Sequence, residues 1–146
     1  MSTYNKRFDY QVNAIQTLCY IVPFDAKENT SRYAFCCPAP KVLWDTGATD
    51  TIISQEVVEA LGLKPVGKCN IEGIGGIIDA LEYKISIYIE GNMEFAEITA
   101  LASEDCGYDL IIGMDVIGLG DFAITNKDGK TWFAFRHPSQ DHIEFH

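Results

Sequence analysis

The chain has 146 residues, of which 47% are hydrophobic and 22% are charged, a size and composition that favour one folded globular domain over two domains or a disordered chain. The formal net charge of −10 argues against nucleic acid as a partner, because phosphate backbones attract basic surfaces. The sequence contains no apolar run long enough to span a bilayer, and we expect neither a secretory signal nor a membrane partner.

The N-terminal part of the sequence predicts a flexible lead followed by strands. Residues 1–13 are polar and aromatic, and we expect them to be flexible. Residues 14–22 are mostly apolar and predict the first strand. A second, short strand is predicted at 33–37, and we expect Pro38 and Pro40 to end it.

The next segment predicts a strand, a tight turn and a helix. Residues 41–44 form an apolar strand that leads directly into Asp45-Thr46-Gly47. Ser54 is a favourable helix N-cap, and residues 54–61 contain good helix formers with apolar side chains on one face. Gly62 is expected to end this helix.

Beyond this helix, the apolar residues recur with a period of two. Residues 83–90 alternate between apolar and polar side chains and predict a half-buried strand. After a turn at 91–92, residues 95–101 predict the returning strand. Residues 109–113 form a short apolar strand that ends in glycine, and residues 114–117 fit one helical turn.

The C-terminal part predicts one more hairpin. Residues 122–125 and 130–135 flank Asn126-Lys127-Asp128-Gly129, a sequence typical of a tight turn. Many short strands, one clear helix and frequent turn residues together predict a mainly β protein with a barrel-like or sandwich core. We expect a single domain over residues 1–146.

Cysteine and histidine patterns predict neither disulfides nor a metal site. The five cysteines are odd in number and lack C-x-x-C spacing, which favours reduced thiols and a cytoplasmic location. They are Cys19, Cys36, Cys37, Cys69 and Cys106. His137, His142 and His146 lie near the C-terminus, where a solvated tail is a simpler interpretation than a metal site. We therefore expect no metal and no cofactor.

The triplet Asp45-Thr46-Gly47 occurs once and is the main candidate for a functional site. A carboxylate at the end of an apolar strand is costly unless its charge is used. An ordinary turn remains the alternative interpretation, because aspartate in such turns bonds its own backbone. Two further motifs favour an active site: a glycine-rich tip, Gly73-Ile74-Gly75-Gly76, and an apolar pair followed by glycine, Ile111-Ile112-Gly113.

In this order, over roughly residues 41–124, the motifs resemble the retropepsin family of single-lobe aspartic proteases, and most closely its bacterial members. The resemblance implies a closed barrel-like retropepsin fold with one short helix after the catalytic loop and a glycine-rich flap hairpin. Residues 126–146 would form a C-terminal extension beyond the family core. The implied activity is that of an aspartic endopeptidase, which hydrolyses peptide bonds in extended polypeptide segments without a cofactor.

The resemblance also implies a role for each motif. Asp45 would be the catalytic residue, supported in its loop by Thr46, Gly47 and Ala48. The glycine-rich tip would close over the substrate as a flap. The apolar pair and its glycine, residues 111–113, would pack beside the catalytic loop.

A single triplet implies a homodimer. Hydrolysis in this family requires two facing carboxylates, which share one proton and activate a water molecule. The sequence contains no second Asp-Thr-Gly or Asp-Ser-Gly. Asp45 would therefore meet Asp45 of a second chain across a two-fold axis.

Two departures from the retroviral pattern leave alternatives open. Retroviral members carry an Asp and an Arg that brace the dimer where this sequence has Thr49 and Met114, and neither Asp50 nor Asp115 has an evident Arg partner. The second departure is an aromatic strand around Phe133, which would either widen a dimer interface or cover the chain's own core. The alternative function is a non-catalytic peptide-binding or dimerisation module on the same fold.

Overall fold

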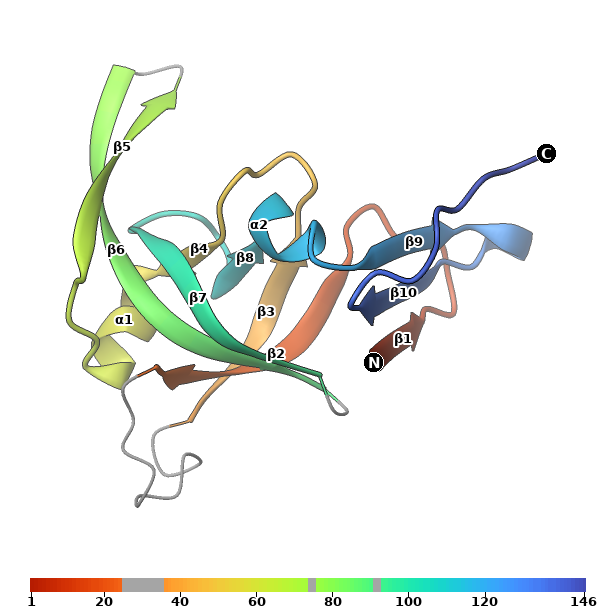
Figure 1. Ribbon diagram of the computed structural model, residues 1–146, viewed down its shortest axis with the longest axis horizontal. Helices are drawn as coiled ribbons and strands as arrows, with labels where there is room; N and C mark the ends of the chain where they lie inside the picture. The colour runs from red at the N-terminus through yellow and green to blue at the C-terminus, as the bar shows by residue number, and fades with distance from the viewer. Residues whose placement is uncertain (25–35, 74–75, 91–92) are drawn as a thin grey trace.

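The computed structural model describes residues 1–24, 36–73, 76–90 and 93–146. A seven-stranded sheet has the strand order β2-β3-β8-β4-β7-β6-β5, and a separate three-stranded sheet has the order β1-β10-β9 (Figure 1). The strands of the larger sheet are β2 (Gln16–Pro23), β3 (Cys37–Trp44), β4 (Ile52–Ser54), β5 (Gly67–Gly73), β6 (Gly76–Ile89), β7 (Met93–Ser103) and β8 (Leu110–Ile112). Those of the smaller sheet are β1 (Ser2–Arg7), β9 (Asp121–Thr125) and β10 (Trp132–His137).

An additional pairing between β2 and β6 closes the larger sheet into a six-stranded barrel. Among the described residues, β5 pairs with β6 alone and lies outside this closure. The predicted mainly β, closed barrel-like fold is confirmed.

The predicted alternation along β6 fills the barrel interior. Ile85 and Ile87 are fully buried, whereas Lys84 and Tyr88 on either side of this pair are only half-buried. Ser86, between the two isoleucines, is also buried, and its hydroxyl donates to the carbonyl of Ala96 at 2.6 Å. Because successive side chains of a strand point to opposite faces, one face of β6 contributes to the core and the other faces outward.

The predicted helix is α1 (Gln55–Leu61). The Ser54 side chain accepts a hydrogen bond from the N–H of Val57 at 3.2 Å, and Gly62 takes a left-handed conformation with φ 61°. Both helix ends therefore follow the capping rules that predict them. Val57 and Val58 turn into the core. Among the described residues, no helix combines the length and apolar character that crossing a bilayer requires.

The prediction that residues 1–13 form a flexible lead is wrong for the strand β1. β1 pairs antiparallel with β10, and Tyr4 lies opposite Phe135. The Tyr4 side chain is 6% exposed, and its ring meets that of Phe133 edge-on at 6.0 Å between centroids. Most residues of this segment are polar, but the buried Tyr4 ring stabilises the N-terminal strand against fraying.

The prediction that Pro38 and Pro40 end a strand is also wrong, because both lie within β3. Over this stretch β3 pairs with β2, with Tyr20 opposite Pro38, whereas its pairing with β8 begins at Val42. Among the described residues, only one edge of β3 is therefore paired where the prolines lie. Proline lacks an N–H to donate, and it is tolerated on such a half-paired stretch. The predicted turn at 91–92 and the start of the predicted strand at 33–37 lie outside the described residues.

The aromatic strand β10 covers the chain's own core. Phe133 and Phe135 are each 1% exposed, and their rings lie 5.0 and 5.1 Å from the ring of Trp44 at the end of β3. The predicted hairpin joins β9 to β10 through a short 3-10 turn, η2 (Lys127–Gly129). Of the two alternatives for the aromatic strand, packing on its own core accounts for the two buried phenylalanines.

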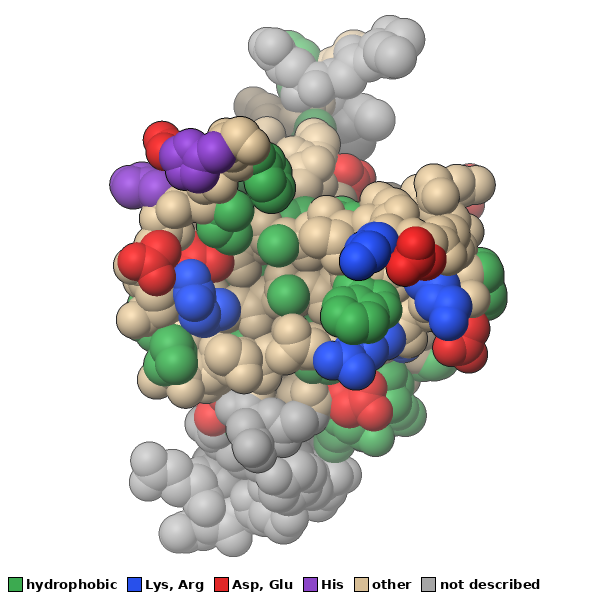
Figure 2. Space-filling view, turned by 90° about the vertical axis from the view of Figure 1, so that its right-hand side faces the viewer, with side chains coloured by type: hydrophobic (Ala, Val, Ile, Leu, Met, Phe, Trp, Pro, Cys, Tyr) green, Lys and Arg blue, Asp and Glu red, His purple; other side chains and the backbone are tan. Residues whose placement is uncertain are grey.

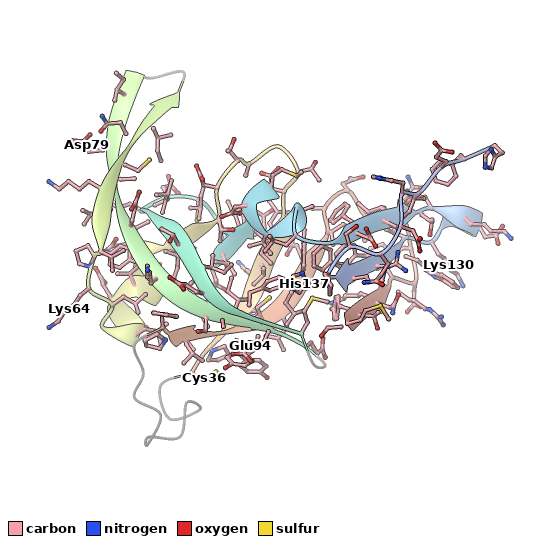
Figure 3. All side chains as sticks on the ribbon, in the orientation of Figure 1. Cys36, Lys64, Asp79, Glu94, Lys130 and His137 are labelled. Atoms are coloured by element: carbon pink, nitrogen blue, oxygen red, sulfur yellow. The ribbon has the colours of Figure 1, made fainter. Side chains whose placement is uncertain are left out.

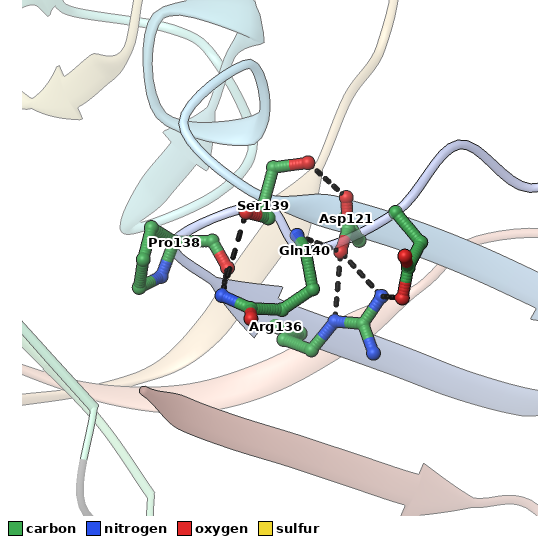
Figure 4. Close-up of polar contacts among 6 residues, drawn as sticks. Asp121, Arg136, Pro138, Ser139 and Gln140 are labelled. Atoms are coloured by element: carbon green, nitrogen blue, oxygen red, sulfur yellow. Dashed lines mark hydrogen bonds and ion pairs between the residues drawn. The ribbon is translucent and has the colours of Figure 1, made fainter.

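The segment after β10 is fastened to β9 through one carboxylate (Figure 4). Asp121 accepts hydrogen bonds from the Ser139 hydroxyl, from the N–H of Gln140 at 2.8 Å and from Nε of Arg136 at 2.7 Å. The Ser139 hydroxyl first, and then the Gln140 N–H and the Arg136 guanidinium, hold the pKa of the Asp121 carboxyl well below its usual range.

Replacing Phe133 by Ala should lower the free energy of unfolding by about 3–5 kcal/mol, because it leaves a cavity beside Trp44. Phe145→Ala removes the same atoms from a side chain that is 93% exposed, and it should cost less than about 1 kcal/mol. Urea unfolding followed by circular dichroism measures both. Equal losses for the two variants would show that β10 is no part of the core.

Asp121→Asn should destabilise the protein at neutral pH and progressively less in acid. A depressed carboxyl pKa contributes stability above the unfolded-state value of about 3.9, and this contribution is lost as the pH falls below it. Melting temperatures of both proteins between pH 6 and pH 2 should therefore converge. Asp128→Asn, on the exposed turn of the same hairpin, is the control and should shift the melting temperature little at any pH. A pH-independent difference for Asp121→Asn would contradict this account.

Candidate active site

Asp45 is the first residue after β3, and its side chain is half-buried. Its backbone N–H donates to the carbonyl of Ile112 at 2.9 Å, which ties the strand end to β8. Its Oδ1 accepts a hydrogen bond from the N–H of Gly47 at 2.8 Å. The carboxylate is therefore oriented by its own loop, with Thr46 and Gly47 exposed beside it.

The apolar pair Ile111 and Ile112 forms the floor under this loop. β3 and β8 run parallel, with Leu43 opposite Ile111 and Trp44 opposite Ile112. On its other side β8 pairs with β4, so the two strands that flank the loop are both held by β8. Residues 111–113 thus lie next to the Asp45 loop, and their role in supporting a catalytic loop stays a prediction.

Gly113 lies where the Asp45 loop passes closest to β8. A Cβ atom at this position would lie 2.6 Å from the carbonyl oxygen of Asp50 and 2.8 Å from that of Ala48. Any side chain would therefore push the loop away. The loop is instead bonded here, since the N–H of Met114 donates to the carbonyl of Ala48 at 2.7 Å.

Asp115, at the start of α2 (Met114–Ile117), fastens the far end of the same loop. Its carboxylate accepts from the N–H of Thr51 at 3.0 Å and from the Thr51 hydroxyl at 2.7 Å. The Thr51 hydroxyl in turn accepts from the N–H of Gly113 at 3.3 Å, and Thr51 is fully buried. Sequence reasoning singles out Asp115 only as lacking an Arg partner and misses Thr51. A carboxylate in the first turn of a helix, close to free backbone N–H groups, is the signal that points to this bracing role.

A cavity of about 410 Å³ opens beside Asp45. Its walls come from four places: the segment between β1 and β2, the end of β3 with the start of its loop, Tyr108 shortly before β8, and β9 with Asn126. Asp45 and Thr46 line it together with Phe122 and Ile124 of β9. The carboxylate thus faces a space that reaches the surface strand β9.

The predicted flap corresponds to the hairpin of β5 and β6. Its two strands pair up to Gly73 opposite Gly76, whereas Ile74 and Gly75 of the predicted flap lie outside the described residues. The hairpin extends beyond the barrel on the same side as the β3–β4 loop that carries Asp45 (Figure 1). Near its end, Ile77 is 66% exposed, so the hairpin presents an apolar side chain to solvent.

A second cavity, of about 360 Å³, lies between the base of this hairpin and the Asp45 loop. Four of its lining residues carry carboxylates: Asp50, Glu82, Glu97 and Asp115. Glu97 is paired with Lys84 at 2.6 Å. Among the described residues, no group of three or more His, Cys, Asp or Glu side chains is arranged to hold a metal ion.

The sequence model of a protein family described as "gag-polyprotein putative aspartyl protease" matches residues 39–118, a range that contains the Asp45 triplet, the hairpin and residues 111–113. The chain belongs to this family. The predicted likeness to retropepsin-like aspartic proteases is thereby confirmed. No curated protein matches the sequence at a significant level.

Solved structures of aspartyl proteases share the fold. A retropepsin-like aspartic protease from Rickettsia conorii superposes with a TM-score of 0.52 at 14% identity, covering 92% of this chain and 93% of that one. The retroviral protease-like domain of Ddi1 from Leishmania major gives a TM-score of 0.52 at 17% identity, and the match covers 84% of this chain and 95% of that one. EIAV protease complexed with the inhibitor HBY-793 gives a TM-score of 0.50 at 20% identity, and the match covers 73% of this chain and 86% of that one.

Asp115→Ala should lower the free energy of unfolding by about 1–3 kcal/mol, because it leaves the buried Thr51 N–H and hydroxyl without their acceptor. The control is Asp50→Ala, since the Asp50 carboxylate has no hydrogen bond to another described residue. Its cost should stay below about 0.5 kcal/mol. Urea unfolding of both variants measures the difference, and equal costs would rule out the brace.

Proposed function

We propose that this aspartyl protease family member is an endopeptidase that hydrolyses peptide bonds in extended polypeptide segments, with Asp45 as its catalytic residue. The observation that carries the proposal is the placement of the Asp45 carboxylate. It lies at the end of β3, over the Ile111–Gly113 floor and beside an open cavity, within the range matched by the family. The bonded loop favours a site over an ordinary turn, since a turn alone requires no such bracing.

The chemistry requires two such carboxylates. Two like charges at close range do not both ionise, so a facing pair shares one proton. The ionised member takes a proton from water as the water attacks the scissile carbonyl, and the protonated member polarises that carbonyl. Thr46, Gly47 and Ala48 would hold the carboxylate in place through the backbone of the loop. No metal or cofactor enters this scheme.

We infer that the second carboxylate is Asp45 of another copy. β9 is the last strand of its sheet, so one of its edges is unpaired among the described residues. Ile124 on β9 is 43% exposed, and it lines the same cavity as Asp45. Two copies that paired along β9 across a two-fold axis would therefore bring their Asp45 loops toward each other.

The β5–β6 hairpin is the proposed flap. An extended peptide beneath it would add its backbone like a strand and present alternate side chains to apolar surface. The exposed Ile77 supplies such a surface on the hairpin, and the glycines of residues 73–76 favour a tip that approaches the substrate backbone closely. None of the five cysteines forms a disulfide, and a reducing compartment such as the cytoplasm is the proposed location.

Asp45→Asn should abolish peptide cleavage while leaving the fold intact, because Asn accepts the Gly47 hydrogen bond but cannot take a proton from water. Wild type and variant are incubated with a peptide library, and products are identified by mass spectrometry. Asp50→Asn, in the same loop, should retain activity. Cleavage that survives Asp45→Asn would refute the mechanism. An inactive wild type that sediments as a dimer would instead favour a non-catalytic peptide-binding module.

A further inference from the structure

The outer face of the three-stranded sheet carries side chains that the core does not use. Along β10, Phe133 and Phe135 point into the core, so Trp132, Ala134 and Arg136 point outward. This outer face lies at the end of the molecule away from the β5–β6 hairpin (Figure 1). It is separate from the proposed catalytic loop.

Trp132 is 49% exposed, although the chain's other tryptophan, Trp44, is 5% exposed. The Arg7 guanidinium lies over the Trp132 ring, 4.2 Å from its centroid, and the two residues face each other across the β1–β10 pairing. A tryptophan held in this way offers a rigid apolar surface with a cation beside it. Tryptophan and arginine are enriched among the residues that contribute most to binding at protein interfaces.

Positive charge gathers around this ring, although the chain as a whole carries −10. A cavity of about 500 Å³ is lined by Trp132, Thr125, Lys127, Asp128 and Lys130. With Arg7, three cations and one carboxylate therefore surround the tryptophan. Figure 2 shows Lys and Arg side chains around a large hydrophobic side chain on this face, with Asp or Glu side chains next to them.

The chain's own C-terminal segment approaches the Arg136 end of this face. Ile143 and outward residues of the sheet, including Ala123 and Ala134, line a further cavity of about 280 Å³. In the same segment, Asp141 lies 3.9 Å from the Arg136 guanidinium. An apolar side chain and a carboxylate of this segment thus lie beside the sheet and one of its cations, with Ile143 55% exposed and the Asp141 side chain 79% exposed.

We propose that Trp132, Arg7, Lys127 and Lys130 form a docking site for an acidic, extended segment of a partner polypeptide. An apolar side chain of that segment would cover the exposed part of the Trp132 ring. Its carboxylates would pair with the lysines, which carry an opposite charge to the rest of this acidic protein. The site is independent of Asp45 and of whether the protein cleaves what it binds.

The test uses the full chain with Asp45→Asn, so that no probe is digested. The probe is a short synthetic peptide in which Glu alternates with Leu, and tryptophan fluorescence reports binding because Trp132 is the exposed tryptophan. We expect a saturable signal that weakens as salt rises. A peptide with Lys in place of Glu should not bind.

Charge reversal locates the site. Lys130→Glu should weaken binding of the Glu peptide by about tenfold, whereas Lys64→Glu should change it by less than about twofold. Both replacements alter the net charge equally, and Lys64 lies at the opposite end of the molecule from Lys130 (Figure 3). Trp132→Phe should keep most of the affinity, measured by calorimetry, and Trp132→Ala should lose it, with circular dichroism confirming that both fold.

Three results would overturn the proposal. One is the absence of saturable binding of the Glu peptide. Another is equal weakening by Lys130→Glu and Lys64→Glu, which would indicate attraction by overall charge alone. The third is tighter binding of a single-stranded oligonucleotide than of the peptide at the same salt concentration, which would assign the cations to a different class of partner.

Discussion

The parallel pairing of β3 with β8 determines where the Asp45 carboxylate lies. Trp44 is locked opposite Ile112, and the next residue along the chain is Asp45, whose own N–H bonds to the Ile112 carbonyl. The aromatic rings of β10 pack on Trp44 from the other side. The position of one carboxylate is therefore set by the barrel and by the C-terminal strand together.

The loop beyond Asp45 is fastened at both ends by contacts within a single chain. Gly113 admits the loop backbone at a distance that no side chain would allow, and Asp115 fixes Thr51 at the loop's far end. In the retroviral pattern a charged pair braces the dimer, and here that pair is replaced by Thr49 and Met114. The internal brace keeps Asp45 in place, and the proposed association of two chains would rest on other contacts, of which the edge of β9 is the one proposed.

Local sequence signals predicted the elements that they encode directly. The helix caps at Ser54 and Gly62, the alternation along β6 and the apolar strand β8 are local patterns, and all three are present in the structure. The failures involve contacts between distant residues. β1 depends on pairing with β10, which lies more than a hundred residues later in the chain. Pro38 and Pro40 are tolerated within β3 because β3 is paired there with β2 and not with β8. The Asp115–Thr51 contact likewise joins residues that are 64 positions apart.

In the proposed mechanism, Asp45 acts only together with Asp45 of a second chain. Mixing wild type with the Asp45→Asn variant at constant total concentration, after exchange of subunits, tests this directly. If every active site needs two wild-type chains, an equal mixture should retain about one quarter of the wild-type activity, following the square of the wild-type fraction. Retention of about one half, in linear proportion, would mean that each chain carries a complete site and would contradict the account.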